Sequence, residues 1–403
     1  MSSQSPNLKS KFHSFAISKN RAAIGATVPA KAALGPFENS RGRDSEVKPN
    51  IKDLSREELI DWLGQHKEPS YRSDQIRRWL LQRGVFSFSE MTNLSTALRD
   101  TMGQEFSISR LPVLLKSRSR DGTEKFLFGL ADGYSIETVL IPEGGRLTLC
   151  LSTQAGCGLG CTFCATAQMG LRRNLKSSEI LDQIIEVQAV MDAGKQLTNL
   201  VFMGMGEPLA NYEQTLKSLK DMTDARGGLG FSPRRITVST VGLVPQIRRL
   251  MEDTKVNLAV SLHATTDTVR SRLMPINRKY SLAELIECCR ALPLQRRKRI
   301  TFEYILLQGI NHEPADASRL SSLLKGIRCK INLIPFNPYH DSPYQTPTPA
   351  EVDGFKDLLM RRGFQVNVRQ SRGQDVQAAC GQLWSDFRSE RVNPKSSYIE
   401  HGV

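Results

Sequence analysis

The sequence predicts an α/β fold in which parallel strands close into a partial (βα)6 barrel, preceded by a small N-terminal helical domain. Six apolar, strand-like runs lie between residues 147 and 338, and helical stretches separate them. Glycine-containing turns mark a β-rich segment just before the first run, and apolar residues recur at three and four positions in the segment before that. A chain of 403 residues is long enough for a barrel and a smaller domain.

Residues 1–48 have the composition of a leader. They hold eight Lys or Arg against three acidic residues, with none before Glu38, and they are rich in Ser and Ala. No compact apolar stretch of a secretory signal is found there. This composition is typical of an organellar transit peptide, and its excess of Ser and Ala over Arg favours the chloroplast, with the mitochondrion second. A disordered basic leader on a cytoplasmic protein is the alternative.

The net charge of +14 remains strongly positive when the leader is set aside. Such an excess of Lys and Arg favours a nucleic-acid partner. No apolar run approaches the roughly 20 residues that a membrane span requires, so we expect no membrane association. Eight cysteines in a chain without a secretory signal indicate reduced thiols with metal or redox roles, and not a disulfide framework.

Residues 49–108 are predicted to form short amphipathic helices, since Leu59, Trp62 and Leu63, and then Ile76 and Leu80, follow helical spacing. Basic side chains stand between these apolar positions. A small basic helical domain suits contact with RNA phosphates, while a solvated helix face is an equally good interpretation. The arginines concerned are Arg72, Arg77, Arg78 and Arg83.

Residues 109–147 alternate apolar and polar positions around the Asp-Gly turns at 121–122 and 132–133, which predicts a β-rich lead-in. The predicted barrel follows over residues 148–385, and a tail completes the chain at 386–403. Because the reactive groups of such barrels lie at the carboxyl ends of the strands, we expect the site there. The six strand-like runs are LTLCLST, NLVFMGMG, RRITVSTVG, VNLAVSLHA, ITFEYILLQG and KINLIPFNP.

Three cysteines, Cys157, Cys161 and Cys164, follow the first strand directly in the stretch GCGLGCTFCATAQMG. A structural zinc site takes four protein ligands, and no second Cys or His pair with suitable spacing follows, so zinc is disfavoured. A 4Fe-4S cluster held by three thiolates leaves one iron open for a small molecule. The neighbouring glycines would let the backbone wrap closely round the cluster.

The C-x3-C-x2-C pattern with Phe163 before its last cysteine resembles the radical S-adenosylmethionine enzymes. The ordered set of further motifs, from about residue 53 to 385, resembles more narrowly the RlmN family of RNA methyltransferases, whose fold is a TIM-like partial barrel. Members of that family methylate carbon 2 of an adenosine in large-subunit rRNA, and some also act on tRNA. The motifs are GCTFCATAQMGLRRNL, MGMGEPLANYE, SPRRITVSTVG, AVSLHA, RLMPIN, CKINLIPFNPY and QAACGQL.

The resemblance implies a 4Fe-4S cluster on the three cysteines and two molecules of S-adenosylmethionine in each turnover. Residues at strand ends are then expected to bind S-adenosylmethionine, because a glycine turn and polar side chains suit its ammonium, carboxylate and ribose groups. Plain turn or structural roles are the alternatives, above all for a lone histidine. The expected cofactor-binding residues are Gly206, Glu207, Ser239, Ser261, Leu262, His263 and Asn337.

The resemblance also assigns the chemistry. Cys380 takes a methyl group from one S-adenosylmethionine, a radical from the second removes a hydrogen atom from it, and the methylene adds to carbon 2 of the adenine. Glu137 matches the base that removes the carbon 2 proton. Cys150 matches the thiol that releases the product and leaves a disulfide with Cys380. Without the family match, Cys150 reads as a core residue and Glu137 as an exposed strand carboxylate.

Two other functions stand beside this one: a Cfr-like enzyme that methylates carbon 8 of adenosine, and a non-catalytic RNA-binding or assembly factor on the same fold. Gln374 and Gln377 stand where the family pattern leads us to expect acidic residues. We expect a monomer with rRNA or tRNA as substrate and an electron donor such as flavodoxin or ferredoxin. The remaining cysteines match no role and are expected in the core; they are Cys288, Cys289 and Cys329.

Overall fold

The computed structural model describes residues 48–192, 194–296 and 298–384. Apart from Lys48, the predicted leader lies outside the described residues, as do residue 385 and the predicted tail at 386–403. Among the described residues, no helix combines the length and the hydrophobicity needed to cross a membrane.

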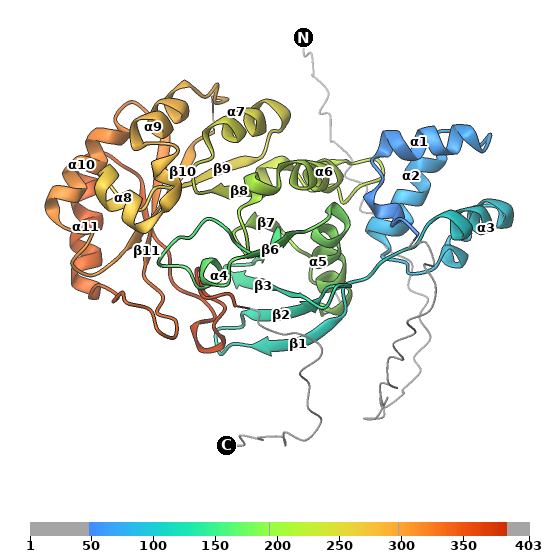
Figure 1. Cartoon of the computed structure of the whole chain (residues 1–403), viewed down its shortest axis with the longest axis horizontal. Coiled ribbons are helices and arrows are strands. Elements are labelled where there is room, and N and C mark those ends of the chain that lie inside the picture. The colour runs from blue at the N-terminus through green and yellow to red at the C-terminus, as the bar shows by residue number, and fades with distance from the viewer. Residues whose placement is uncertain (1–47, 193, 297, 385–403) are drawn as a thin grey trace, which may run out of the picture. The chain divides into compact units, whose positions relative to one another are not determined.

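A mixed sheet of ten strands forms the centre of the fold (Figure 1), in the order β1-β2-β3-β4-β7-β8-β9-β10-β11-β12. Strands β1 to β4 pair antiparallel, and every pair from β4 to β12 is parallel. The predicted α/β partial barrel is therefore confirmed. The bounds are β1 Val113–Arg118, β2 Glu124–Gly129, β3 Ser135–Glu143, β4 Arg146–Cys150, β7 Asn199–Phe202, β8 Ile236–Thr240, β9 Asn257–Ser261, β10 Ile300–Leu306, β11 Cys329–Pro335 and β12 Val366–Val368.

The sheet differs from the prediction in three respects. The parallel part has a seventh strand, β12, whose three residues are too few to show a periodic pattern. The predicted lead-in is no separate unit, because β3 pairs with β4 and so continues the barrel sheet. A second, two-stranded sheet of β5 (Gln154–Gly156) and β6 (Leu171–Asn174) encloses the cysteine loop, and its short strands were not predicted.

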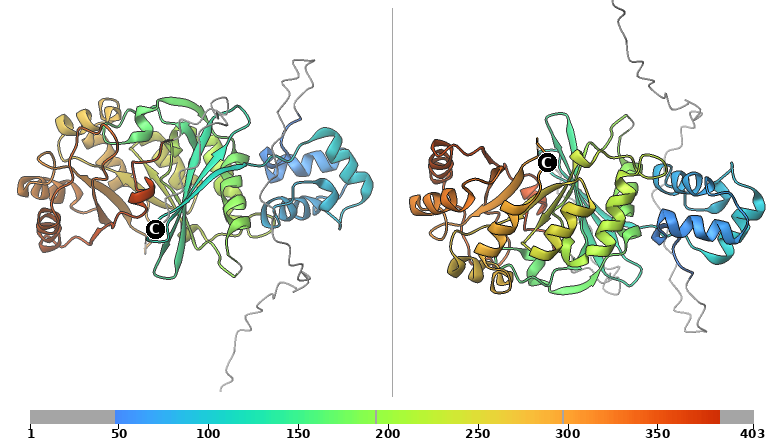
Figure 2. Two further views of the ribbon diagram at one scale, coloured as in Figure 1. Left: turned by 90° about the horizontal axis from the view of Figure 1, so that it is seen from below. Right: turned by 90° about the horizontal axis from the view of Figure 1, so that it is seen from above.

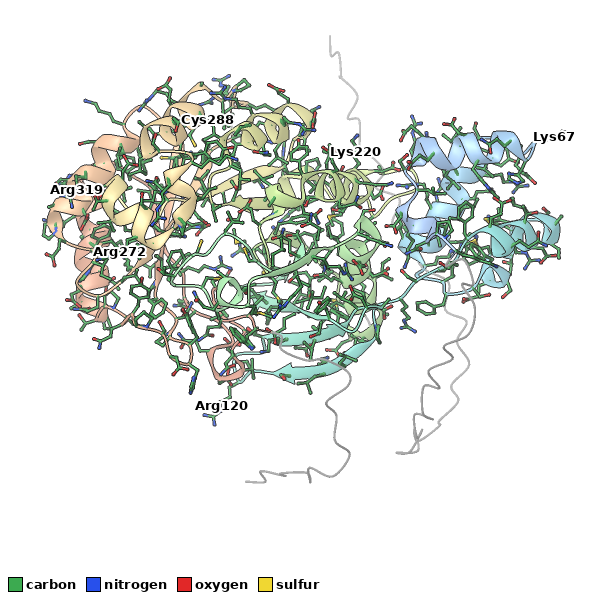
Figure 3. The ribbon with its side chains drawn as sticks, in the orientation of Figure 1. Lys67, Arg120, Lys220, Arg272, Cys288 and Arg319 are labelled. Carbon is green, nitrogen blue, oxygen red and sulfur yellow. The ribbon has the colours of Figure 1, made fainter. Side chains whose placement is uncertain are left out.

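Helices cover one face of the parallel strands (Figure 2). One of them, α9, starts at a capping box of Ser281 and Glu284, and both of its cysteines, Cys288 and Cys289, are buried in the core as predicted. Figure 3 shows Cys288 among these helices, while Cys329 is half-buried at the start of β11. The bounds are α5 Ser177–Val190, α6 Tyr212–Thr223, α7 Val244–Asp253, α8 Asp267–Leu273, α9 Leu282–Ala291, α10 Pro314–Leu324 and α11 Pro349–Arg361.

Strand β10 shows how the sheet separates a dry face from a polar interior. Phe302 and Tyr304 are completely buried, and the Tyr304 ring stacks on Phe355 of α11 at 5.7 Å between centroids. The alternating residues Thr301 and Glu303 face the barrel interior, where they line cavities. This alternation follows from the two-residue period of a strand, and it leaves room for chemistry inside the barrel.

The predicted N-terminal helices are present as α1 (Arg56–Gln65), α2 (Arg72–Arg77) and α3 (Thr96–Glu105), with a π-helical turn after α2 (Figure 1). Arg77 is buried, and its guanidinium lies 2.7 Å from the carboxylate of Asp221 on α6. Arg77 therefore joins this region to the barrel and is not available for RNA phosphates. Arg83 is exposed and stacks over the Trp79 ring at 3.9 Å from the centroid.

Candidate active site

The three predicted cluster cysteines lie together at the carboxyl ends of the barrel strands. Cys157 follows β5, and Cys164 directly precedes the short helix α4 (Ala165–Gln168). All three line one cavity, together with Gly206, Glu207, Ser239, Ser261 and His263. The structure therefore brings the three cysteines and five of the seven expected cofactor-binding residues together around one cavity.

Two glycines allow the backbone to come close around this cavity. Gly156 has φ +73°, and a Cβ added there would lie 1.9 Å from the carbonyl oxygen of Gly170. Gly206 has φ +94°, and a Cβ added there would lie 2.5 Å from Cβ of Gln154. Neither contact is sterically possible, so both positions require glycine.

The cysteines fit a cationic cluster better than they fit free thiols. Burial raises the pKa of Cys157 to about 12 and that of Cys161 well above its ordinary value. Raised pKa values keep such thiols neutral in the absence of a metal, whereas iron would stabilise the thiolate forms that ligate it. Cys157, Cys161 and Cys164 are therefore the residues that would hold a 4Fe-4S cluster.

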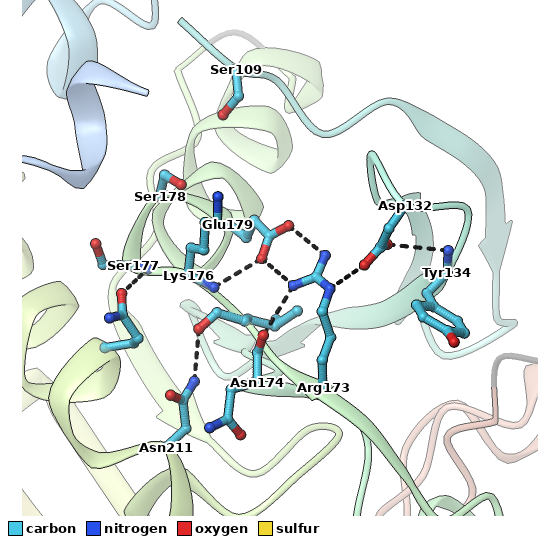
Figure 4. Close-up of polar contacts among 12 residues, drawn as sticks. Ser109, Asp132, Tyr134, Arg173, Asn174, Lys176, Ser177, Ser178, Glu179 and Asn211 are labelled. Atoms are coloured by element: carbon cyan, nitrogen blue, oxygen red, sulfur yellow. Dashed lines mark hydrogen bonds and ion pairs between the residues drawn. The ribbon is translucent and has the colours of Figure 1, made fainter. Parts of the chain in front are cut away.

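Strand β6, which follows the cysteine loop, is held in place by the contacts of its Arg173 side chain (Figure 4). Its guanidinium binds Glu179 of α5 through two nitrogens, at 2.7 and 2.8 Å, and also contacts Asp132 in the turn before β3. Nearby, the side chain of Asn211 donates to the carbonyl of Leu175 at 2.8 Å. These contacts brace β6, and through β5 they fix the start of the loop.

Glu207 is buried, and both of its carboxylate oxygens accept hydrogen bonds from the backbone. Oε1 accepts from the N–H of Leu209 at 3.0 Å, and Oε2 accepts from the N–H of Val241 at 2.9 Å. Burial raises the pKa of Glu207 to about 7 against these bonds. The carboxylate therefore also organises the ends of β7 and β8, as the turn interpretation expected.

His263 lies at the end of β9 in a left-handed backbone conformation, with φ +60°. Its Nδ1 accepts from the N–H of Ile305 at 3.0 Å, so the ring hydrogen is on Nε2. Burial lowers the pKa of His263 to about 3, and the ring meets Phe163 edge-on at 4.9 Å. The imidazole is therefore neutral, and it positions Phe163 beside the cluster cysteines.

Leu262 and Asn337, the other two expected cofactor-binding residues, do not line this cavity. Leu262 is buried, and its N–H donates to the carbonyl of Glu303 at 3.0 Å. Asn337 lines a second cavity that also reaches Cys380. Its Nδ2 donates to the Cys380 carbonyl at 3.1 Å, which makes Asn337 a support for the Cys380 loop.

The two predicted reactive thiols are neighbours. Cys380 lines the cavity of the cluster cysteines, while Cys150, at the end of β4, is buried and lies outside that lining. Burial raises the pKa of Cys150 to about 12, the charge of Cys380 adds to this effect, and the charge of Arg369 opposes it. The structure thus places the cavity-lining Cys380 near enough to the buried Cys150 for its charge to raise the Cys150 pKa.

Glu137 is buried on β3 and is not the exposed strand carboxylate that the alternative interpretation described. Its Oε1 lies 2.8 Å from Nζ of Lys125, and its Oε2 accepts from the N–H of Trp384 at 3.0 Å. Burial raises the pKa of Glu137, and Lys125 opposes this effect. A carboxylate with a raised pKa beside the Cys380 segment has the properties of a proton acceptor.

Three charged residues of the site were missed by the sequence analysis. Arg369 follows β12, lines both cavities and donates to the sulfur of Met203 at 3.4 Å. Arg270 is completely buried, and it donates to the carbonyls of Val241 at 2.7 Å and of Ser261 at 3.1 Å. Glu303 lies inside the barrel on β10. Strand alternation could have indicated Glu303, since a polar residue stood at an inward position of an apolar run.

A parallel partial barrel that carries three cysteines in a loop after its first strand defines a radical S-adenosylmethionine enzyme. The family model of the radical SAM superfamily matches residues 151–320, and that of the ribosomal RNA large subunit methyltransferase N-terminal domain matches residues 49–108. A crystal structure of a radical SAM methyltransferase from Sphaerobacter thermophilus superimposes with a TM-score of 0.78 and 43% identity, covering 83% of this chain and 99% of that one.

Curated relatives identify the family within the radical S-adenosylmethionine enzymes. The dual-specificity RNA methyltransferase RlmN of Syntrophus aciditrophicus is 48% identical over 343 residues, which cover 85% of this chain and 98% of that protein. The protein of the same name from Geobacter sulfurreducens is 50% identical over 352 residues, which cover 87% and 96%. This chain belongs to the RlmN family.

Proposed function

We propose that this enzyme methylates carbon 2 of adenosine in RNA through a methylated Cys380. The observation that carries this proposal is the arrangement of thiols: Cys380 shares a cavity with the three cluster cysteines, and it lies near enough to Cys150 for its charge to raise the Cys150 pKa. A binding factor without turnover needs none of these sulfur atoms. The names of the relatives support RNA as the substrate.

Carbon 2 of adenine is electron-poor, so it does not attack the methyl group of a sulfonium. When bound, the cluster with S-adenosylmethionine supplies a 5′-deoxyadenosyl radical. The Cys380 thiolate first attacks the methyl group of one S-adenosylmethionine, so its Sγ–methyl bond forms as the sulfonium–methyl bond breaks and S-adenosylhomocysteine leaves. After the S-methyl group loses a hydrogen atom, the Cys380 methylene radical adds to carbon 2, and the enzyme and the RNA are covalently joined.

Release of the methylated RNA from Cys380 depends on Glu137 and Cys150. Glu137 takes the carbon 2 proton, and the Cys150 thiolate attacks Sγ of Cys380. The bond between Sγ and the methylene breaks, and the methylene takes a proton to become the methyl group of the product. A disulfide between Cys150 and Cys380 remains with the unpaired electron, which passes to a redox partner. We propose that flavodoxin or ferredoxin serves as that partner and that the enzyme acts as a monomer.

The test is mass spectrometry of nucleosides from RNA incubated with anaerobically reconstituted enzyme and S-adenosylmethionine. We expect 2-methyladenosine with the wild-type enzyme and none with Cys161→Ala, which removes a cluster ligand. Cys329→Ala, outside the site, is the matched control and should retain activity. Formation of 8-methyladenosine would show the Cfr-like reaction, and unmodified RNA with an intact cluster would contradict the proposal. Separate rRNA and tRNA substrates would show which of them is used.

We also propose that residues 1–48 direct the chain to the chloroplast, with the mitochondrion as the second choice. The support is their composition, rich in Ser and Ala and poor in acids. A fluorescent protein fused behind residues 1–48 should enter plastids, and the same fusion without those residues should stay in the cytosol. Diffuse cytosolic fluorescence of both fusions would contradict this proposal without affecting the proposed reaction.

A further inference from the structure

Glu303 is a buried carboxylate that the proposed reaction leaves unused. It lies in the middle of β10, in register with Ser261 of β9 and Asn332 of β11, and only 3% of its surface is exposed. Its Oε1 accepts from Nδ2 of Asn332 at 3.0 Å, and its Oε2 has no hydrogen-bond partner. A buried carboxylate oxygen without a partner is costly, so a ligand that donates to it would be stabilised there.

The position of Glu303 relates it to the reacting thiol. Glu303 lines the cavity of the cluster cysteines and also the second cavity, and Cys380 and Arg369 likewise line both. Within the described part of the chain, the first cavity has one other carboxylate, Glu207, whose two oxygens are both occupied by backbone N–H groups. Glu303 therefore offers an unpaired acceptor oxygen among the residues that, like Cys380, line both cavities.

The charges around Glu303 suit a hydrogen-bond acceptor. Burial raises the pKa of Glu303, and the charge of Arg369 is the first influence that opposes this. Oε2 of Glu303 has no hydrogen-bond partner, so Arg369 does not occupy it. The carboxylate thus keeps one buried, unpaired oxygen while the charge of Arg369 acts on it.

An adenine whose carbon 2 faces Cys380 presents a defined pattern to its surroundings. Nitrogen N1 and the exocyclic amine follow carbon 2 along the same edge of the ring, and the amine is the hydrogen-bond donor of that edge. A carboxylate oxygen accepts such a bond and repels the O6 acceptor that guanine has in the same place. We propose that Oε2 of Glu303 recognises the exocyclic amine of the target adenine and so selects adenine for methylation.

This inference rests on the proposed function. It is tested by combining a change of the Glu303 side chain with a change of the target base in the RNA. The RNA substrate is prepared with adenosine or with purine ribonucleoside, which lacks the exocyclic amine, at the target position. With the wild-type enzyme, removal of the amine should lower kcat/KM about 10- to 100-fold, as loss of a hydrogen bond to a charged group does. With Glu303→Leu, the two substrates should react equally, because the acceptor is absent.

Glu303→Gln keeps an acceptor oxygen and should restore part of the preference for adenosine. Thr301→Val, two residues earlier on the same face of β10, is the matched control and should keep the full preference. Formation of 5′-deoxyadenosine without RNA should change less than about twofold in all variants, because Glu303 is assigned to the RNA base and not to the cofactor.

The outcomes separate the claims. An unchanged preference in Glu303→Leu, with a wild-type enzyme that forms 2-methyladenosine, overturns the inference alone. Loss of 5′-deoxyadenosine formation in Glu303→Leu and Glu303→Gln assigns Glu303 to the cofactor and also overturns it. A wild-type enzyme that methylates no adenosine overturns the proposed function, and this inference falls with it.

Discussion

The carboxylate of Asp121 accepts a hydrogen bond from the backbone N–H of Gly373 at 2.9 Å, although 252 residues separate the two in the chain. Asp375 forms the reciprocal contact, since it accepts from the hydroxyl of Ser119 at 2.6 Å and from the N–H of Arg120 at 3.2 Å. Figure 3 shows the side chain of Arg120 pointing outward from this turn. The turn between β1 and β2 and the loop that leads to Cys380 therefore hold each other through two carboxylates.

Asp121→Asn should loosen the Cys380 loop. The change removes the charge that strengthens the bond from Gly373, so the loop should open more often. We expect alkylation of Cys380 by iodoacetamide at neutral pH to accelerate about 2- to 10-fold, a modest effect because Asp121 is exposed. Peptide mass spectrometry measures it. Asp353→Asn, on the exposed side of α11, is the control, and an equal acceleration there would contradict the prediction.

The stabilising effect of Asp121 should also depend on pH. Burial raises its pKa, but hydrogen bonds, led by that from the N–H of Thr123, outweigh this and lower the pKa from 3.8 to about 2. Because the folded pKa is the lower one, the contribution is present above pH 3.8 and is lost as the pH falls through about 2. The difference in urea midpoint between wild type and Asp121→Asn should therefore be seen at pH 6 and vanish near pH 2. A constant difference would contradict this.

Lys125→Met should shift the pH dependence of product release. Glu137 must be ionised to accept a proton, and Lys125, 2.8 Å away, favours the ionised form. Without that cation the pKa of Glu137 rises further, so the acid limb of the release rate should move to higher pH by about one unit. Single-turnover decay of the protein-RNA adduct measures this limb. Lys125→Arg keeps the charge and should leave it in place; the same shift in both variants would exclude an electrostatic role.

Gln374→Asp should detach the Cys380 loop from Asn337. Nε2 of Gln374 donates to Oδ1 of Asn337 at 3.0 Å, and Nδ2 of Asn337 donates to the Cys380 carbonyl. A carboxylate at position 374 cannot donate, so it repels Oδ1 and disturbs both bonds. We expect about a two- to fivefold rise in proteinase K cleavage between residues 370 and 382 at neutral pH, as loss of a neutral hydrogen bond would cause.

The control for this change is Gln377→Asp. Gln377 has φ +51°, which Asp tolerates, and its bonds are made by its backbone: its N–H donates to the Gln374 carbonyl at 3.1 Å, and its carbonyl accepts from Nζ of Lys125 at 3.4 Å. Its substitution should leave the cleavage rate unchanged. Equal cleavage of the Gln374→Asp and Gln377→Asp variants would show that the hydrogen bonds from Gln374 through Asn337 to Cys380 do not stabilise the loop.

The sequence predicts those parts of the structure that depend on local patterns. Apolar runs placed β4 and β7 to β11 because each strand buries one side chain in two against helices. The cysteine loop was found because its three ligands lie within eight residues. By contrast, β12 has three residues, and pairing with β11 alone defines it. Short strands of this kind follow from the assembled sheet and not from their own sequence.

Contacts of charged side chains between distant segments could not be predicted from the sequence either. The Asp-Gly signal at 121–122 predicted a turn but not its contact with Gly373, because nothing local links positions 252 residues apart. Four arginines of the N-terminal helices appeared alike, yet Arg77 is buried against Asp221 while Arg83 is exposed. Which cations remain free for RNA depends on the packing of α2 on α6, and this packing is visible only in the fold.

The pair of reactive thiols makes the sharpest prediction, because the two single variants should fail in different ways. Cys380→Ala has no sulfur to methylate and should form no bond to RNA. Cys150→Ala can still be methylated and can add to the adenine, but no thiolate attacks Cys380 afterwards, so a covalent protein-RNA species should accumulate. Denaturing gels with labelled RNA measure it, and Cys329→Ala should behave as the wild type.

In the wild-type enzyme, the lifetime of this adduct should depend on the ionisation of Cys150. Burial raises its pKa to about 12, so at neutral pH few molecules carry the thiolate, and that fraction grows about tenfold for each pH unit. Between pH 7 and pH 9 the adduct should therefore decay faster by roughly that factor per unit. Arg369 opposes the raised pKa, so Arg369→Met should lengthen the lifetime at every pH in this range. A lifetime independent of pH, or an adduct absent from Cys150→Ala, would show that another group releases the RNA.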